Sequence, residues 1–440
     1  MAEELPPPAR PRGSRTQIFV WTLFDFARTA FSVMIKTVGY ALFFREIVTL
    51  SSPKSDLYWG IADSLSMLTA AILSPILGAA SDYAQGRKRF LLGFTLTCVM
   101  FTALLSSVQP GMIFFGMLFF ILANIGFEGG YAFYDAFLPQ ITTKRSYGRV
   151  SGYGFAMGYL GALTILAISF PLIKGGLGGE NLSNFRLSFL VAAAFFLVFA
   201  LPMFLFLKER RTTTPRKVPY IRLGFRRAVR TLRHIRSYRD IAWFLLAFFL
   251  YIDAVNTVIF FAAIFARGTL GFSEVEIIIF FIVTQTTAIL GSILFGILTD
   301  HFGPKKTISV TLIMWIGVVV GAFLVETKFG FYMIGLLAGM SIGSSQSASR
   351  SLMARLTPPQ HEAEFFGFYD GICGNASAIL GPSIFGLISA ITGSQRIAVL
   401  SIGFFFLSGL LVLQKVREGL HPANGERISS AEPPGPPSLS

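Results

Sequence analysis

The chain has 440 residues, of which 53% are hydrophobic and only 14% are charged, and its mean hydropathy is +0.64. An ordinary soluble domain carries about 25% charged residues, so this composition excludes a soluble globular protein. The net charge of +14 raises the question of a nucleic-acid partner, but the basic residues lie in loops between apolar segments, and we expect no such partner.

Twelve apolar segments of roughly membrane-spanning length follow one another along the chain. They cover residues 18–44, 57–80, 90–107, 112–138, 149–173, 186–207, 241–265, 275–299, 307–325, 329–354, 365–391 and 396–414. The sequence therefore predicts an all-α membrane protein with twelve transmembrane helices in two six-helix halves. We divide it into a disordered N-terminus (1–17), a first half (18–207), a basic linker (208–240), a second half (241–414) and a disordered tail (415–440). The third, sixth and twelfth segments are almost purely apolar and are expected to face lipid.

The first and seventh segments share the pattern Asp-x-x-polar-Thr, at Asp25 to Thr29 and at Asp253 to Thr257. Residues three apart lie on one helical face, so Asp25 with Arg28, and Asp253 with Asn256, are expected to point into the bundle. Asp25 and Arg28 suit either a structural or gating pair or a charged solute. We favour the pair, because Asp25 lies in the cytoplasmic third of its segment. Asp253 lies about midway with no cation beside it, and desolvation disfavours a charged carboxylate, so it is the candidate proton or solute site.

The loops after the second and eighth segments repeat one motif, Gly-x-x-x-Asp followed by glycine and basic residues. The copies run from Gly78 to Asp82 and on to Arg87, and from Gly296 to Asp300 and on to Lys305. The acid ends a helix, and each cation can pair with that acid or with the end of a neighbouring helix. We predict a gating role for Asp82, Arg87, Asp300 and Lys305.

The basic linker contains Phe225, Val229 and Leu232 at helical spacing, with arginines on the rest of the helix surface. Such an amphipathic helix could lie on anionic headgroups. We favour the simpler interpretation, a linker that sets the topology.

The two loop motifs resemble the signature of the major facilitator superfamily, although the first copy has one extra residue between Asp82 and Gly86. Within it the chain resembles the vacuolar (amino-acid) effluxer-like family, in the stretches Trp21–Ala27, Asp135–Pro139, Ser151–Gly154, Ser349–Leu352 and Phe365–Tyr369. The family has an amide where this chain has Arg28. The resemblance implies alternating access, a central cavity lined largely by segments 1, 4, 7 and 10, and a pair between Lys36 and Glu128.

Other polar groups in the apolar segments extend the candidate site. Asp370 and Asn375 in the eleventh segment join Lys36 and Glu128 as candidates, and Asp63 and Gln285 are further interior positions. Asp135 and Arg350 lie near the cytoplasmic ends of their segments. We therefore predict that these two act as gate or signature residues.

Enzyme chemistry has little support in this sequence. The four histidines are isolated in loops, Cys98 and Cys373 lie inside apolar segments, and neither a metal site nor a nucleotide-binding loop is predicted. We expect no cofactor and a transport cycle driven by a gradient.

The leading hypothesis is a secondary transporter of a small organic solute, with an amino acid as one candidate and protons as a coupling partner. The alternative is a lipid or amphiphile translocase or a drug effluxer, favoured by the 47 phenylalanines. We expect a monomer in the plasma (cell inner) membrane, or in a vacuolar-type membrane if the source is eukaryotic.

The distribution of basic residues predicts that both termini are cytoplasmic. Loops on the side of the termini hold 28 of the 37 lysines and arginines, the opposite loops hold 7, and Arg28 and Lys36 lie within the first segment. A phosphatase that is active only outside the cytoplasm, fused after Gly419, should therefore be inactive. The same reporter after Lys174 should be active, and the reverse result would invert the topology.

Overall fold

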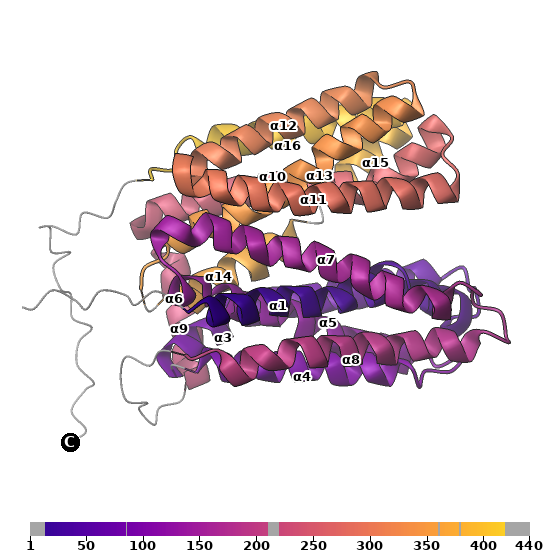
Figure 1. The fold of residues 1–440 in the computed structure, drawn as a ribbon, viewed down its shortest axis with the longest axis horizontal. Helices are drawn as coiled ribbons and strands as arrows, with labels where there is room; N and C mark the ends of the chain where they lie inside the picture. Colours follow the sequence, from indigo (N-terminus) through magenta and orange to yellow (C-terminus); the bar gives the residue numbers. More distant parts are fainter. Residues whose placement is uncertain (1–13, 85, 210–219, 360, 378–379, 419–440) are drawn as a thin grey trace, which may run out of the picture.

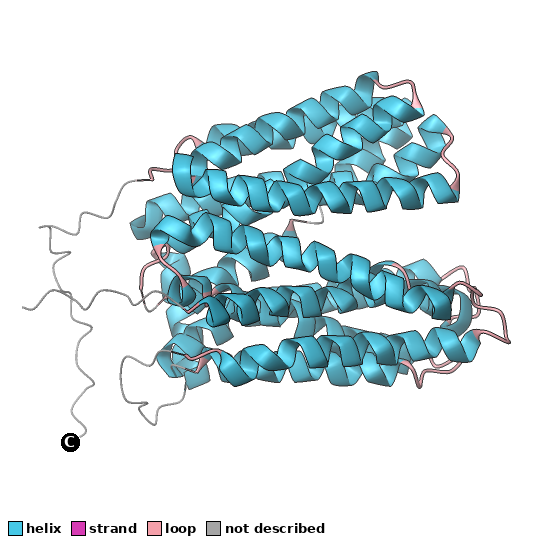
Figure 2. Cartoon of the chain, in the orientation of Figure 1, coloured by secondary structure: helices cyan, strands magenta, loops and turns pink. Residues whose placement is uncertain are grey.

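The computed structural model describes residues 14–84, 86–209, 220–359, 361–377 and 380–418. Within these ranges all regular structure is helical (Figure 2). Most of the two termini predicted to be disordered, residues 1–13 and 419–440, lies outside the described residues.

The helices follow the order of the predicted segments, with η marking π or 3-10 turns. The first half contains α1 (Arg15–Phe31), η1 (Ser32–Thr37), α2 (Tyr40–Phe43), η2 (Phe44–Val48), α3 (Ser55–Ala84), α4 (Arg87–Leu105), α5 (Ile113–Asp135), α6 (Leu138–Ile141), η3 (Lys144–Ser146), α7 (Tyr147–Ile173) and α8 (Leu182–Phe206). The linker contains α9 (Tyr220–Arg233) and η4 (Ile235–Tyr238). The second half contains α10 (Arg239–Leu270), α11 (Glu274–Phe302), α12 (Pro304–Leu324), α13 (Lys328–Leu356), α14 (Glu362–Phe366), η5 (Gly367–Gly374), α15 (Leu380–Thr392) and α16 (Gln395–Leu413).

Ten of the helical segments in the described residues are long and apolar enough to cross a membrane. The other two predicted segments correspond to α13, which is rich in serine, and to the interrupted path through α14, η5 and α15. The structure is thus consistent with twelve membrane crossings.

Most serines of α13 satisfy their hydroxyl groups within the helix itself, whereas the hydroxyl of Ser351 has no hydrogen-bond partner among the described residues. The hydroxyl of Ser341 donates to the carbonyl oxygen of Leu337, and that of Ser345 donates to the carbonyl oxygen of Ser341, both at 2.7 Å. Ser344 and Ser347 make the same kind of bond one turn back. A helix with many hydroxyls is therefore buried without needing polar partners on its neighbours.

Two predicted segments are not continuous α-helices. The first passes through π turns at Ser32–Thr37 and Phe44–Val48. The eleventh has a π stretch at Gly367–Gly374, and α15 begins only at Leu380. Three glycines lie in that π stretch, and glycine costs about 1 kcal/mol in an α-helix, which explains the weakness of the helix there.

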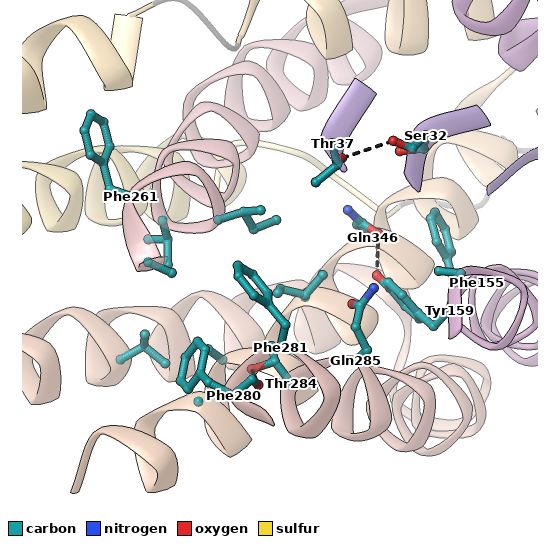
Figure 3. Close-up of a pocket in the computed structure, with 18 of the residues that line it drawn as sticks. Ser32, Thr37, Phe155, Tyr159, Phe261, Phe280, Phe281, Thr284, Gln285 and Gln346 are labelled. Atoms are coloured by element: carbon teal, nitrogen blue, oxygen red, sulfur yellow. Dashed lines mark hydrogen bonds between the residues drawn. The ribbon is translucent and has the colours of Figure 1, made fainter. Parts of the chain in front are cut away.

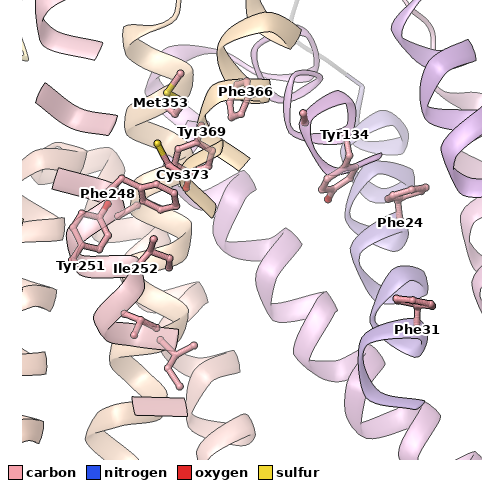
Figure 4. Packing of buried hydrophobic residues seen from close by; sticks show 14 of the residues in the cluster. Phe24, Phe31, Tyr134, Phe248, Tyr251, Ile252, Met353, Phe366, Tyr369 and Cys373 are labelled. Carbon is pink, nitrogen blue, oxygen red and sulfur yellow. The ribbon is translucent and has the colours of Figure 1, made fainter. Parts of the chain in front are cut away.

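The two halves of the chain contact each other at helix crossings that contain glycines, and Figure 1 shows α7 of the first half beside α11 of the second. At the crossing of α7 and α11, a methyl group on Gly152 would overlap the carbonyl oxygen of Ser292. At the crossing of η5 and α3, Gly367 lies against the backbone of Pro75. Each half also has its own aromatic packing, with Phe24 beside Tyr134 and Phe248 beside Tyr369 (Figure 4). Small residues at the crossings let the helix backbones approach closely.

The close crossing of α7 and α11 gives a stability prediction. Gly152→Leu should lower the melting temperature of the purified protein by several degrees, because overpacking a close contact typically costs about 1–3 kcal/mol. Gly93→Leu is the matched control, since no atom lies within 4 Å of a Cβ at Gly93. Equal melting temperatures for the two variants would contradict the crossing.

Candidate functional site

A cavity of about 420 Å³ lies between the two halves of the chain. Its lining comes from α1, α5 and α7 of the first half and from α10, α11 and α13 of the second. Turn η1 and helices α12, α15 and α16 also contribute, the three helices through Val318, Val319, Ala322, Phe385, Val399 and Ile402. The expected lining by segments 1, 4, 7 and 10 is thus incomplete, and the twelfth segment does not face lipid alone.

The polar part of the cavity wall comes largely from the first half of the chain. Asp25, Arg28, Thr29, Ser32 and Thr37 line it along the first segment. Tyr159 of α7 donates a 2.8 Å hydrogen bond to the side-chain oxygen of Gln346 on α13, and Gln285 of α11 lies beside them (Figure 3). Amide, hydroxyl and charged groups therefore converge on one region of the cavity.

The opposite wall is apolar and aromatic. Phe261, Phe280 and Phe281 lie across the cavity from Ser32 and Gln346 (Figure 3). Phe265, Phe331 and Phe385 also line it, and Phe280 stacks on Phe331 with a centroid separation of 4.8 Å. Nothing in the sequence distinguishes these rings, because phenylalanine is frequent throughout the apolar segments. A ligand in this cavity would meet polar groups on one side and apolar rings on the other.

Arg28 projects a partly satisfied guanidinium to the cavity wall. Its Cζ atom lies 3.4 Å from the ring centroid of Tyr131 and 4.5 Å from that of Phe127. Its Nη1 atom is 4.0 Å from Asp25 and has no hydrogen-bond partner among the described residues. The contact between Arg28 and Asp25 is therefore a loose ion pair, and the cation is held mainly against aromatic faces.

Asp25 pairs with a cation of the other half, Arg350 on α13. Arg350 is fully buried, and its Nε donates to Asp135 at 2.9 Å while Nη1 donates to Asp25 at 3.2 Å. Tyr134 also donates to Asp25 at 2.8 Å. This cluster joins α1 and α5 to α13 beside the cavity. Sequence analysis named all three charged residues but could not pair them, because they lie far apart along the chain.

Lys36 and Glu128 meet as the resemblance implied. Lys36 Nζ lies 3.0 Å from Glu128 and 3.9 Å from Asp63. The amide of Asn124 donates to Ser66 at 2.7 Å beside them. None of these residues lines the cavity. The cluster joins the π turn η1 to α3 and α5 within the first half.

Asp253 is completely buried outside the cavity. Its carboxylate faces the backbone N–H groups of Leu380 and Gly381 at the start of α15, and no side chain in the described residues hydrogen-bonds it. Asn256, one turn later, donates to Ser377 at 3.4 Å. The helix interruption in the eleventh segment, which the sequence analysis missed, thus brings a helix N-terminus to Asp253.

Asp370 and Asn375 are buried at 8% and 6% exposure in and just after η5. Neither lines the cavity. One carboxylate oxygen of Asp370 has no hydrogen-bond partner among the described residues. The structure therefore places both residues near the interrupted helix and away from the cavity wall.

The first copy of the loop motif links the two halves. Arg87 contacts Asp82 at 2.7 Å and Glu362 of α14 at 2.6 Å. Asp82 also accepts backbone hydrogen bonds from Ala363 at 3.2 Å and Glu364 at 3.0 Å, at the start of α14. Here the cation pairs with the acid of its own motif, and both reach across to the second half.

The residues of the second copy of the motif make different contacts. Asp300 accepts hydrogen bonds from the backbone N–H of Gly148 at 2.8 Å and from Arg149 Nε at 2.9 Å, at the start of α7. Lys305 donates instead to the carbonyl oxygens of Gln414 at 2.9 Å and Val416 at 2.7 Å, at the end of α16. Asp300 therefore bridges the halves, whereas Lys305 stays within its own half.

A third link comes from the linker helix α9, which the sequence analysis treated as topological. Arg227 Nε lies 2.7 Å from Glu364, and the hydroxyl of Thr231 donates to the other oxygen of Glu364. His361 lies 3.0 Å from the same carboxylate. No group of three or more His, Cys, Asp or Glu side chains that could hold a metal ion occurs in the part of the chain that the structure describes.

Comparison with known proteins places these features in one family. The sequence matches the family described as vacuole effluxer Atg22 like over residues 55–148 and 143–419. It is 33% identical over 407 residues to the MFS-type transporter YxiO of Bacillus subtilis, covering 90% of this chain and 94% of that protein. It is 25% identical over 398 residues to autophagy-related protein 22 of Kluyveromyces lactis, covering 83% and 79%.

The fold agrees with that of a solved transporter. The crystal structure of the human organic anion transporter MFSD10 superposes with a TM-score of 0.71 at 16% identity, covering 93% of this chain and 100% of that one. Together with the sequence matches, this shows a multi-pass membrane protein that performs secondary transport of a solute and is not an enzyme. The chain belongs to the Atg22-like vacuole effluxer family, within the major facilitator superfamily of transporters.

Proposed function

We propose that the chain transports an amino acid through the cavity between its halves. The observation that carries the proposal is the presence of Asp25 and Arg28 on one cavity wall, with the two charges only loosely paired at 4.0 Å. A zwitterion presents an ammonium and a carboxylate to such a pair. The aromatic wall opposite would hold its side chain.

Alternating access would work by breaking and remaking the ionic links at one end of the bundle. This is the end that carries the loops rich in lysine and arginine, and we call it the basic end. In this structure the Arg350 cluster, the Arg87 cluster and the link between Arg149 and Asp300 all join the halves at that end. We assign gating roles to Asp82, Arg87, Asp135, Asp300 and Arg350, whose contacts must be lost when that end opens. Lys305 would instead hold α12 to α16 throughout the cycle.

An amphiphile translocase or drug effluxer is the second candidate, because the aromatic wall is extensive. For either function we place the basic end in the cytoplasm, on the distribution of basic residues. We propose a monomer in the plasma (cell inner) membrane, or in a vacuolar-type membrane in a eukaryote.

Ligand binding distinguishes the two candidates. Amino acids should raise the melting temperature of the detergent-purified protein, because a ligand at 100 times its Kd stabilises by about 2.7 kcal/mol. Arg28→Gln should abolish the shift. Arg45→Gln, just beyond the end of that segment with a side chain 63% exposed and outside the cavity, should retain it. Stabilisation by lysolipids alone would favour the amphiphile function.

Asp253 is our candidate for proton coupling, because it is a buried carboxylate with no cationic partner in the described residues. Asp253→Asn should abolish accumulation driven by a pH gradient in proteoliposomes and still permit exchange of solute at equal concentrations. Asp56→Asn, which changes an exposed carboxylate, should leave both activities unchanged. Accumulation by the Asp253 variant with wild-type pH dependence would shift the assignment to Glu128 or Asp370.

A further inference from the structure

Helix α9 presents three parallel stripes of different chemistry. Residues spaced by four and three positions along a helix share a face. Gly224, Ala228 and Thr231 form a buried stripe; Phe225, Val229 and Leu232 form an apolar stripe; and Arg222, Arg226, Arg230 and Arg233 form a basic stripe. The buried stripe contacts the rest of the protein, whereas the basic stripe is exposed along its whole length.

The buried stripe docks α9 onto the outer side of α3. A methyl group on Gly224 would overlap the carbonyl oxygen of Ile76 and the backbone of Ala80. Ile76 continues a stripe on α3 that includes Leu68 and Ile72, which are 59% and 54% exposed. Leu68 and Ile72 do not line the cavity between the halves, so we infer that this exposed apolar stripe faces lipid and that α9 lies on the lipid side of the bundle.

The position of α9 along α3 corresponds to the headgroup level. With 30 residues, α3 is about 45 Å long, whereas the hydrocarbon core is about 30 Å thick. Its last turns, from Ile76 to Ala84, therefore extend from the edge of the hydrocarbon into the headgroup region. The apolar stripe of α9 has Phe225 at 53% and Leu232 at 57% exposure in that region.

We propose that α9 binds anionic lipid at this leaflet, which we expect to be the cytoplasmic one. Phe225, Val229 and Leu232 insert at the boundary of the acyl chains, and the four exposed arginines bind lipid phosphates. The described helix has no acidic residue, so its charge complements an anionic surface. This proposal rests on the membrane location and not on the identity of the solute.

Lipid bound to α9 would also act on the contact between the halves. Arg227 and Thr231, on the protein-facing side of the same helix, bind Glu364 of α14. Holding α9 against α3 therefore holds Glu364 and stabilises the arrangement with the basic end closed. Anionic lipid is thus a ligand that favours one conformation of the cycle.

The headgroup contacts are tested on the full-length protein in detergent. Added phosphatidylglycerol should raise the melting temperature by several degrees more than phosphatidylcholine. The shift should be lost when Arg222, Arg226, Arg230 and Arg233 are all changed to Gln, and kept when they are changed to Lys. The control changes Arg89, Arg145, Arg239 and Lys306, which are exposed elsewhere, to Gln. An equal shift in the α9 Gln variant, or equal loss in the control, would overturn the proposal.

Insertion is tested separately by fluorescence quenching in nanodiscs that contain phosphatidylglycerol. Cys98 and Cys373 are buried, so a fluorophore can be placed selectively at Leu232→Cys or at the exposed His234→Cys. A spin label near the top of the lipid acyl chain should quench the first fluorophore several-fold more than the second. Equal quenching would contradict insertion of the apolar stripe, even if the lipid still shifts the melting temperature.

Discussion

The buried charge of Arg350 is the constraint on which the rest of the site depends. A fully buried guanidinium is tolerated only while carboxylates neutralise it, and removing one partner from such a pair costs about 3–5 kcal/mol. Asp25 and Asp135 come from one half of the chain and Arg350 from the other, so the halves cannot separate here without solvating all three. Asp25 also lines the cavity beside Arg28. The carboxylate of Asp25 therefore takes part both in closing the basic end and in the chemistry of the cavity wall.

The two copies of the loop motif show how similar sequences acquire different roles. In each copy the cation can pair with the acid or with a helix end; Arg87 does both, through Asp82 and the carbonyl oxygen of Ala136 at the end of α5, and Lys305 only the second. Arg87 pairs with Asp82 and reaches Glu362, whereas Lys305 binds the end of α16 and leaves Asp300 to Arg149. The repeated acids both bridge the halves; Arg87 also bridges them through Glu362, whereas Lys305 stays within its own half. The two copies of the motif thus place their acids and cations at equivalent positions but give them different partners.

Local pattern predicted the helices and the residues that avoid lipid, because the cost of exposing a charge to hydrocarbon acts on each residue separately. Asp25, Lys36, Glu128, Asp253 and Arg350 were all identified in this way. Their partners on other helices depend on how the helices are arranged, and of these only the pair of Lys36 and Glu128 was predicted, from family resemblance. The break between η5 and α15 was missed because a short polar stretch such as Asn375 to Ser377 also occurs inside continuous helices, as the serines of α13 do. The contributions of α12 and α16 to the cavity were missed because purely apolar helices look lipid-facing whether they line a cavity or not.

The serines of α13 have a consequence for motion. Hydroxyls that bond carbonyl oxygens of their own helix travel with that helix, so most of its polar groups form no cross-links to α7 or α11. Glycines at the facing positions, such as Gly339 against Thr284 and Gly343 against Ala288, leave a smooth surface at the crossing with α11. The helix that carries Arg350 is therefore held within its own half largely by close backbone packing, and its polar ties to the first half are few: the charge cluster at one end and the bond between Gln346 and Tyr159.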